Sequence, residues 1–195
     1  MPSEPTLLAF DTSAARCAAA LLRGSEIVVT RAEAMSRGQA ERLMPLLEEV
    51  LSEAGLGWKD LDAIGVGVGP GNFTGIRISV SAARGLALGL NIPAVGVSGF
   101  DALAEITPDG HLPAISAPRD QVYVQTSEGP RLMPRAEAEG LGPLFTATDP
   151  NAHVQAIAHV AERRYGTETE PPAPLYIRPA DAAPSRDLPP VLLDE

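Results

Sequence analysis

The sequence predicts an α/β protein with two lobes, a larger one over residues 1–107 and a smaller one over residues 108–195. Three observations lead to this expectation. Three strand-like runs open the chain, helical and strand-like segments then alternate, and the alternation stops at the turn-rich stretch Thr107-Pro108-Asp109-Gly110. With 195 residues, of which 45% are hydrophobic, the chain can bury a substantial core.

The opening strands are predicted over residues 6–10, 17–22 and 27–30. The first is a compact apolar run that ends at Asp11-Thr12-Ser13. The actin, Hsp70 and sugar-kinase fold begins in a similar way, with this turn facing phosphate and metal. An aspartate at a strand end also commonly hydrogen-bonds nearby backbone N–H groups. Asp11 and Thr12 are therefore candidate nucleotide-facing residues, with a purely structural turn as the alternative.

Residues 39–54 have helical periodicity, and Gly55-Leu56-Gly57 closes the helix. Its apolar residues span roughly 160° of a helical wheel, and they are Leu43, Met44, Leu46, Leu47, Val50 and Leu51. Because this arc is wide for packing on one sheet, we predict that Leu43, Leu47 and Val50 also meet a partner protein. A second helix of the same domain is the alternative occupant of that surface.

A glycine-rich turn, Gly69-Pro70-Gly71-Asn72, joins a strand predicted over residues 61–68 to a helix predicted over residues 74–90. Thr74 is placed to cap this helix. A helix N-terminus can hold an anion, so Gly71, Asn72 and Thr74 are candidate phosphate-facing residues. Such turns also need glycine for geometry alone. A P-loop and the dinucleotide fingerprint are excluded, because no lysine follows Gly71 and the glycine spacing does not fit.

The helix over residues 74–90 is rich in small residues, so we expect it to be buried almost all round and closely approached by another backbone. Ala82 and Gly85 belong to a stripe of small residues, while Arg77 and Arg84 lie within roughly 20° of each other on the helical wheel. We predict that Arg77, Ala82 and Gly85 contact a partner protein, with Arg77 meeting an anion or a carboxylate. The alternative for Ala82 is that it faces the chain's own sheet. A solvated position on the helix ridge is the alternative for Arg77.

A further strand is predicted over residues 93–97, followed by a helix capped by Ser98. The resulting order of elements matches the ribonuclease H-like lobe of the actin and Hsp70 superfamily, although a parallel doubly wound sheet fits the pattern too. The second lobe supplies fewer elements. Strands are predicted over residues 112–116 and 121–126 and a helix over residues 152–164, before a proline-rich tail from about residue 168.

Charge and cysteine content restrict the class of protein. With 25 acidic and 15 basic residues, the net charge of -10 opposes direct binding to a nucleic-acid backbone. The single cysteine, Cys17, cannot form an internal disulfide, which fits a reducing compartment. No apolar run reaches the ~20 residues that span a bilayer, and the N-terminus lacks the basic start of a signal peptide. We therefore expect a cytoplasmic protein without membrane contact.

No catalytic residue and no metal site are predicted. The three histidines, His111, His153 and His159, form no His-x-x-x-His pair. The stretch Gly96-Val97-Ser98-Gly99-Phe100 misses the nucleophile elbow, which needs glycine where Phe100 stands. No Asp-Gly phosphate loop follows residue 110. A nucleotide cleft of the actin type would be only half built.

One longer pattern carries a resemblance to a known family. The stretch Gly69-Pro70-Gly71-Asn72-Phe73-Thr74-Gly75-Ile76-Arg77 resembles a specific pattern of the TsaB family, YeaZ-like and glycopeptidase-like proteins of bacterial tRNA threonylcarbamoyladenosine biosynthesis in the actin/Hsp70 superfamily. Similar matches occur at residues 7–13, 40–45, 121–123 and 174–179, so the resemblance touches both ends of the chain. The chain departs from the family at Arg37-Gly38-Gln39, where relatives commonly carry a histidine.

The resemblance implies a non-catalytic subunit that supports a TsaD-type threonylcarbamoyltransferase, with a TsaE-type ATPase assisting. The product is N6-threonylcarbamoyladenosine at position 37 (t6A37) of tRNAs reading ANN codons. The chain would meet TsaD through its helices over residues 39–54 and 74–90, reach tRNA only through the complex, and form a homodimer when alone. We expect this chain to bind no cofactor by itself. Whether ATP or ADP binds at the interface with the partner is left open.

Two other classes of function remain as rivals. The first is an active ATPase or glycopeptidase-like enzyme of the same superfamily, for which turnover abolished by Asp11→Ala would be diagnostic. The second is a direct RNA-binding module, which the net charge of -10 disfavours.

Overall fold

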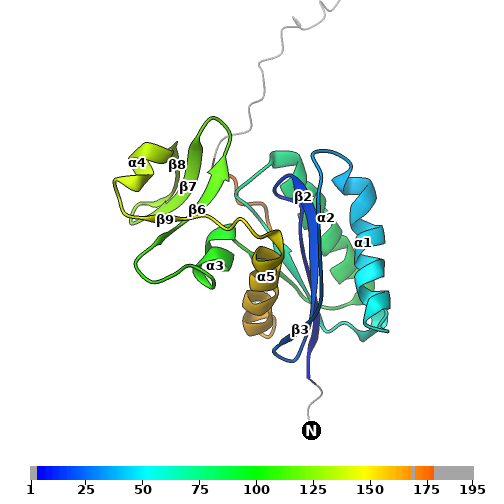
Figure 1. Ribbon diagram of the computed structural model, residues 1–195. Helices are drawn as coiled ribbons and strands as arrows, with labels where there is room; N and C mark the ends of the chain where they lie inside the picture. Colours follow the sequence, from blue (N-terminus) through cyan, green and yellow to red (C-terminus); the bar gives the residue numbers. More distant parts are fainter. Residues whose placement is uncertain (1–3, 168–169, 178–195) are drawn as a thin grey trace, which may run out of the picture.

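The computed structural model describes residues 4–167 and 170–177 (Figure 1). The N-terminal lobe is built on a five-stranded sheet in the order β3-β2-β1-β4-β5. Its strands are β1 (Thr6–Asp11), β2 (Arg16–Arg23), β3 (Glu26–Ala34), β4 (Ala63–Gly67) and β5 (Ala94–Val97). The first three strands pair antiparallel, whereas β1, β4 and β5 run parallel. This mixed sheet is the predicted ribonuclease H-like lobe, and it excludes the all-parallel alternative.

The central strand β1 is buried on both faces. Every one of its residues is buried, and side chains alternate between the two faces of a strand. Leu8 and Phe10 enter one hydrophobic core, while Leu7 and Ala9 enter another. Both faces of the sheet therefore need a helical layer.

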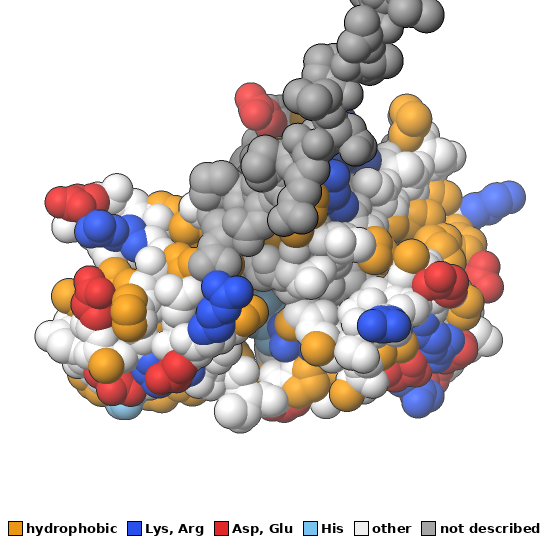
Figure 2. All heavy atoms as spheres, turned by 90° about the horizontal axis from the view of Figure 1, so that it is seen from above, with side chains coloured by type: hydrophobic (Ala, Val, Ile, Leu, Met, Phe, Trp, Pro, Cys, Tyr) orange, Lys and Arg blue, Asp and Glu red, His pale blue; other side chains and the backbone are white. Residues whose placement is uncertain are grey.

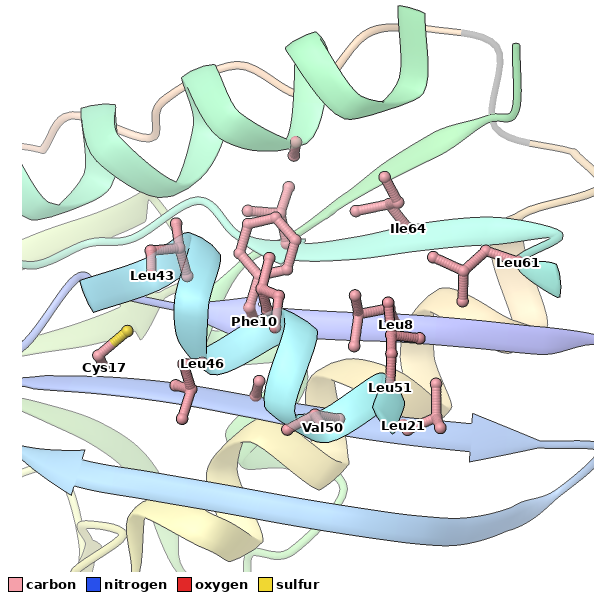
Figure 3. Packing of buried hydrophobic residues seen from close by; sticks show 14 of the residues in the cluster. Leu8, Phe10, Cys17, Leu21, Leu43, Leu46, Val50, Leu51, Leu61 and Ile64 are labelled. Carbon is pink, nitrogen blue, oxygen red and sulfur yellow. The ribbon is translucent and has the colours of Figure 1, made fainter. Parts of the chain in front are cut away.

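Helices α1 (Gln39–Glu53) and α2 (Phe73–Leu90) cover the face that carries Leu8 and Phe10 (Figures 1 and 3). Leu43, Leu47 and Val50 of α1 lie in this core, and each is at most 1% exposed. The wide apolar arc of α1 is thus covered by the sheet and by α2 of the same chain. The predicted partner-binding role of these three residues is wrong, because their side chains have no surface to offer.

Helix α5 (Pro150–Arg164) covers the opposite face, with α3 (Gly99–Ala104) beside it. This layer packs closely because both sides are lined by small residues. A Cβ atom on Gly65 of β4 would stand 2.7 Å from the Cβ atom of Ala161. The predicted division at residue 107 is corrected here, since α5 was assigned to the C-terminal lobe and packs on the N-terminal sheet.

The second lobe is a four-stranded sheet in the order β8-β7-β6-β9. It comprises β6 (Leu112–Ala117), β7 (Gln121–Thr126), β8 (Gly129–Pro134), α4 (Arg135–Glu139) and β9 (Leu144–Phe145). The elements β8, α4 and β9 were not predicted from the sequence. Its small core consists of Ala114, Val122, Val124, Met133 and Ala138, with Leu144 packed against it. The part of the predicted tail over residues 178–195 lies outside the described residues.

Helix α2 begins and packs differently from the prediction. Asn72 is its N-cap, with the side-chain oxygen accepting a 2.8 Å hydrogen bond from the Gly75 N–H, so Thr74 is not the cap. The helix is also buried on one face only, with Gly75, Ile76, Ser79, Val80 and Ala83 inside. A short 3-10 helix, η1 (Trp58–Asp60), lies between α1 and β4. None of the helices in the described ranges has the length and apolar character needed to cross a membrane.

Candidate functional site

The turn after β1 and the start of α2 are bonded to each other. The Thr12 hydroxyl donates a 2.7 Å hydrogen bond to the Gly75 carbonyl, and the Asn72 N–H donates a 2.6 Å bond to the Ser13 carbonyl. A Cβ atom on Gly75 would overlap the Thr12 carbonyl oxygen, and one on Gly71 would overlap that of Ser13. The glycines are thus needed for close backbone approach, which is the structural role that the sequence left open.

The contact between the turn after β1 and the start of α2 occupies the place where the sequence suggested a bound phosphate group. Thr12 is fully buried. Asp11 is 1% exposed and accepts hydrogen bonds from the Ser13 N–H and from Nη2 of Arg16, which also pairs with its charge at 3.3 Å. Both candidate residues are therefore held by protein groups. The residues present do not fit the phosphates of a nucleotide between this turn and α2.

An inter-lobe cleft of about 840 Å³ lies beside this corner (Figure 2). Gly71 and Asn72 line it from the N-terminal lobe, and Ala114–Pro118 and Tyr123 line it from the second lobe. Arg16 and His153 are the lining residues with basic side chains. Among residues 4–167 and 170–177, no three His, Cys, Asp or Glu side chains gather closely enough to hold a metal ion.

His153, from the first turn of α5, is a buried base at this cleft. It is 7% exposed, and its burial lowers the pKa of the imidazole below the ordinary value of 6.5. The negative charge of Asp11 opposes this shift, and the positive charge of Arg16 adds to it. His153 stands at the N-terminal end of α5, and it is buried there because α5 returns to the first lobe.

Cys17 is a core residue rather than a reactive thiol. It is fully buried, and burial together with the nearby Glu33 raises the pKa of the thiol to about 11. The thiolate is the nucleophilic form of cysteine, so this side chain stays in its unreactive form near neutral pH.

Thr74 lies at a separate, smaller hollow between the starts of α1 and α2. This hollow has a volume of about 450 Å³, and its lining includes Arg37, Gly38 and Gln39. The position where the chain departs from the family pattern therefore faces the start of α2. Gly71 thus lines the cleft, Thr74 lines the smaller hollow, and Asn72 lines both.

The outer face of α2 is open. Leu88 is 85% exposed, and a Cβ atom on Gly85 or Gly89 would meet nothing within 4 Å. Arg77 and Gly85 share this face, whereas Ala82 lies at its margin, packed in part on the chain's own core. Of the six predicted partner-binding residues, the structure brings only these three together on α2. Leu88 lies within the helix predicted over residues 74–90, but sequence reasoning did not select it.

Arg77 is engaged by two aromatic rings. Its guanidinium carbon lies 3.9 Å from the centroid of the Phe73 ring, and its Nε donates a 2.9 Å hydrogen bond to the Tyr176 hydroxyl. Arg77 is exposed on the helix, but its side chain is held by these two contacts. Tyr176 lies within a stretch that carried the family resemblance, but no local pattern places it beside α2.

A match to a known protein family shows which family the chain belongs to. Residues 27–138, more than half of the chain, match the family described as "TsaD: tRNA N6-adenosine threonylcarbamoyltransferase". The chain belongs to this family. The TsaB protein of Haemophilus influenzae, named for tRNA threonylcarbamoyladenosine biosynthesis, is 38% identical over 124 residues, which cover 60% of this chain and 52% of that protein. The chain thus spans about half the length of this curated TsaB relative.

Three further proteins match nearly the whole chain. A protein of Mycobacterium tuberculosis is 32% identical over 201 residues, covering 92% of this chain and 94% of that protein. The solved structure of YeaZ from Pseudomonas aeruginosa has a TM-score of 0.67 at 28% identity, covering 88% of this chain and 99% of that one. Another solved protein, described as similar to the peptidase YeaZ, has a TM-score of 0.71 at 27% identity, covering 89% and 100%. The resemblance to the TsaB and YeaZ proteins is confirmed.

The two glycines of α2 provide a matched test of the corner. Gly75→Ala should lower the free energy of unfolding by about 2 kcal/mol or more, because the new methyl group overlaps the Thr12 carbonyl. Gly85→Ala, where nothing lies within 4 Å, should instead raise it by roughly 1 kcal/mol through helix propensity. Urea unfolding of both variants measures the difference. Equal effects of the two substitutions would contradict the close approach described here.

His153 should make stability depend on pH in a defined window. Its folded pKa lies below the unfolded value of 6.5, so below that pH the unfolded chain binds more protons and stability falls as the pH is lowered. His153→Gln should flatten the curve of unfolding free energy as the pH is lowered from 6.5. His159→Gln, on the same helix, is the control and should keep the wild-type slope. Parallel curves for wild type and His153→Gln would rule out this contribution.

Proposed function

We propose that the chain is a non-catalytic subunit that supports a TsaD-type threonylcarbamoyltransferase in forming t6A37 on tRNAs that read ANN codons. Membership of the TsaD family and similarity to a protein named TsaB support this proposal. The structural observation that carries it is the open outer face of α2, where Leu88 is 85% exposed.

The open face of α2 has the features of a contact surface for another helix. Gly85 and Gly89 carry no side chain and have no neighbour of their own chain above them, so a partner backbone can approach closely. Leu88 supplies an apolar anchor between these glycines. A large exposed leucine costs little by itself, but its place on a small-residue helix face is typical of a surface that is covered in an assembly.

The proposed partners follow from the same surface and from the charge of the chain. A TsaD-type subunit would cover α2, and a TsaE-type ATPase would join the assembly. The net charge of -10 makes contact with tRNA through the assembly more favourable than contact through this chain. Thr12 and Gly75 are hydrogen-bonded to each other where a nucleotide phosphate would otherwise bind in this chain. We therefore propose that any ATP or ADP lies at the interface with the partner.

Loss of the protein should lower the t6A content of tRNA. If the subunit supports the transferase, depletion reduces the amount of active complex and unmodified adenosine accumulates at position 37. Mass spectrometry of nucleosides from bulk tRNA, before and after depletion, measures this change. Unchanged t6A in depleted cells that hold no second gene of the family would defeat the proposal.

The same surface is proposed to form a homodimer when the chain is alone. An exposed, self-complementary helix face can pair around a twofold axis. Gly85→Arg should yield a folded monomer, because the position is open and arginine favours the helix more than glycine does. Its affinity for the TsaD-type subunit should fall at least about tenfold, since the long side chain blocks close approach.

Gly166→Arg is the matched control, because it makes the same change just after α5 at another glycine with nothing within 4 Å. Light scattering, circular dichroism and calorimetry distinguish the outcomes. A Gly85→Arg variant that still dimerises and still binds the TsaD-type subunit would remove α2 from both interfaces. Ala82→Arg is a less clean test, because Ala82 packs in part on the chain's own core.

A further inference from the structure

Arg77 is held in one orientation by residues from two distant parts of the chain. Phe73, one turn earlier on α2, lies beneath the guanidinium group, whose carbon is 3.9 Å from the ring centroid. Tyr176, 99 positions further along the chain, accepts the hydrogen bond from Nε. The two rings are themselves in contact, with centroids 4.9 Å apart and planes tilted by 31°. An exposed arginine is thereby fixed before any partner binds.

The segment that carries Tyr176 is itself anchored. The Leu175 N–H donates a 2.8 Å hydrogen bond to the carbonyl of Val68, directly after β4. Pro172 is buried, close enough that a Cβ atom on Gly96 of β5 would lie 3.2 Å from its own Cβ atom. These contacts tie residues 172–176 to the ends of two core strands. Tyr176 can therefore act as a fixed support for Arg77.

The guanidinium group keeps donors that these contacts do not use. It has five N–H donors in a planar fork, and Tyr176 takes the one on Nε. Within the described ranges, 4–167 and 170–177, no carboxylate lies at salt-bridge distance from Arg77, although Arg16 and Arg31 each have one and Arg42 has two. The outward edge of the fork matches the geometry of a carboxylate, which it can bind with two hydrogen bonds.

The charge around Arg77 favours a carboxylate of a partner protein over an RNA phosphate. Helix α2 carries Arg77 and Arg84 and no acidic residue, so it is a basic strip on a chain whose net charge is -10. A single carboxylate is attracted by this strip at short range. A polyanion would also feel the repulsion of the surrounding acidic surface.

We infer that Phe73 and Tyr176 hold Arg77 as a preformed carboxylate-binding side chain, and that it receives an aspartate or glutamate of the TsaD-type subunit. This inference rests on the proposed function and names the chemistry of its contact. Tyr176 is a positioning residue, because it acts through Arg77. The segment 172–176 thus belongs to the interface together with α2.

The test is calorimetric titration of the full chain with the TsaD-type subunit encoded by the same genome. Arg77→Gln should weaken binding by about 10- to 100-fold, since a charge-assisted hydrogen bond is lost. Arg77→Lys should restore only part of the affinity, because the ammonium group lacks the planar fork. Tyr176→Phe keeps the ring, removes only the hydroxyl and should weaken binding about two- to fivefold.

Two further readouts separate this role from a merely structural one. Binding by the wild type should weaken as salt is raised, and Arg77→Gln should reduce that salt dependence. Tyr176→Phe should have no added effect in the Arg77→Gln background, because its effect passes through Arg77. Arg23→Gln, at the exposed end of β2, is the control and should bind like wild type. Circular dichroism establishes that each variant is folded.

The outcomes distinguish the inference from the function on which it rests. If the wild type fails to bind the TsaD-type subunit, the proposed function is overturned and the inference falls with it. If the wild type binds and both Arg77→Gln and Tyr176→Phe bind equally well, only the inference is overturned. Unchanged affinity for the subunit together with weaker retention of tRNA by the Arg77→Gln complex would assign Arg77 to a phosphate and likewise overturn it.

Discussion

The close contact between the turn after β1 and the start of α2 fixes most of the molecule. Glycine at positions 71 and 75 lets the two backbones meet, and the hydrogen bonds of Thr12 and Asn72 lock them together. This contact sets the direction in which α2 leaves the sheet. One face of α2 then packs on the core while the other, with Gly85 and Leu88, stays open. The same contact also uses the groups that a phosphate would otherwise have met.

The sequence predicted the N-terminal sheet well because its strands are short apolar runs separated by recognisable turns. Burial was predicted wrongly where it depends on packing between residues that are far apart in the chain. The apolar arc of α1 was too wide for one sheet, but the arc also packs near α2, so Leu43, Leu47 and Val50 are internal. Helix α5 could be predicted as a helix, whereas its return to the first sheet has no local signal.

The site shows the same division between local and distant information. The motif from Gly69 to Arg77 predicted the turn, and side-chain capping by Asn72 instead of Thr74 moved the helix start by one residue. Arg77 could be singled out because it stands in that motif. Its support by Tyr176 could not, since the two residues are 99 positions apart and meet only after the chain has crossed the second lobe. The open face of α2 likewise depends on which side the core occupies.

The return of α5 has a consequence for how the protein is made. During synthesis, β1, β2 and β4 leave the ribosome long before residues 150–164, which cover their second face. Until then that alanine-lined face of the sheet lacks α5, its main helical cover, whatever the state of α1 and α2. The N-terminal lobe is therefore not a unit that can mature from its own first 107 residues. The whole second lobe must be translated before the first lobe can close.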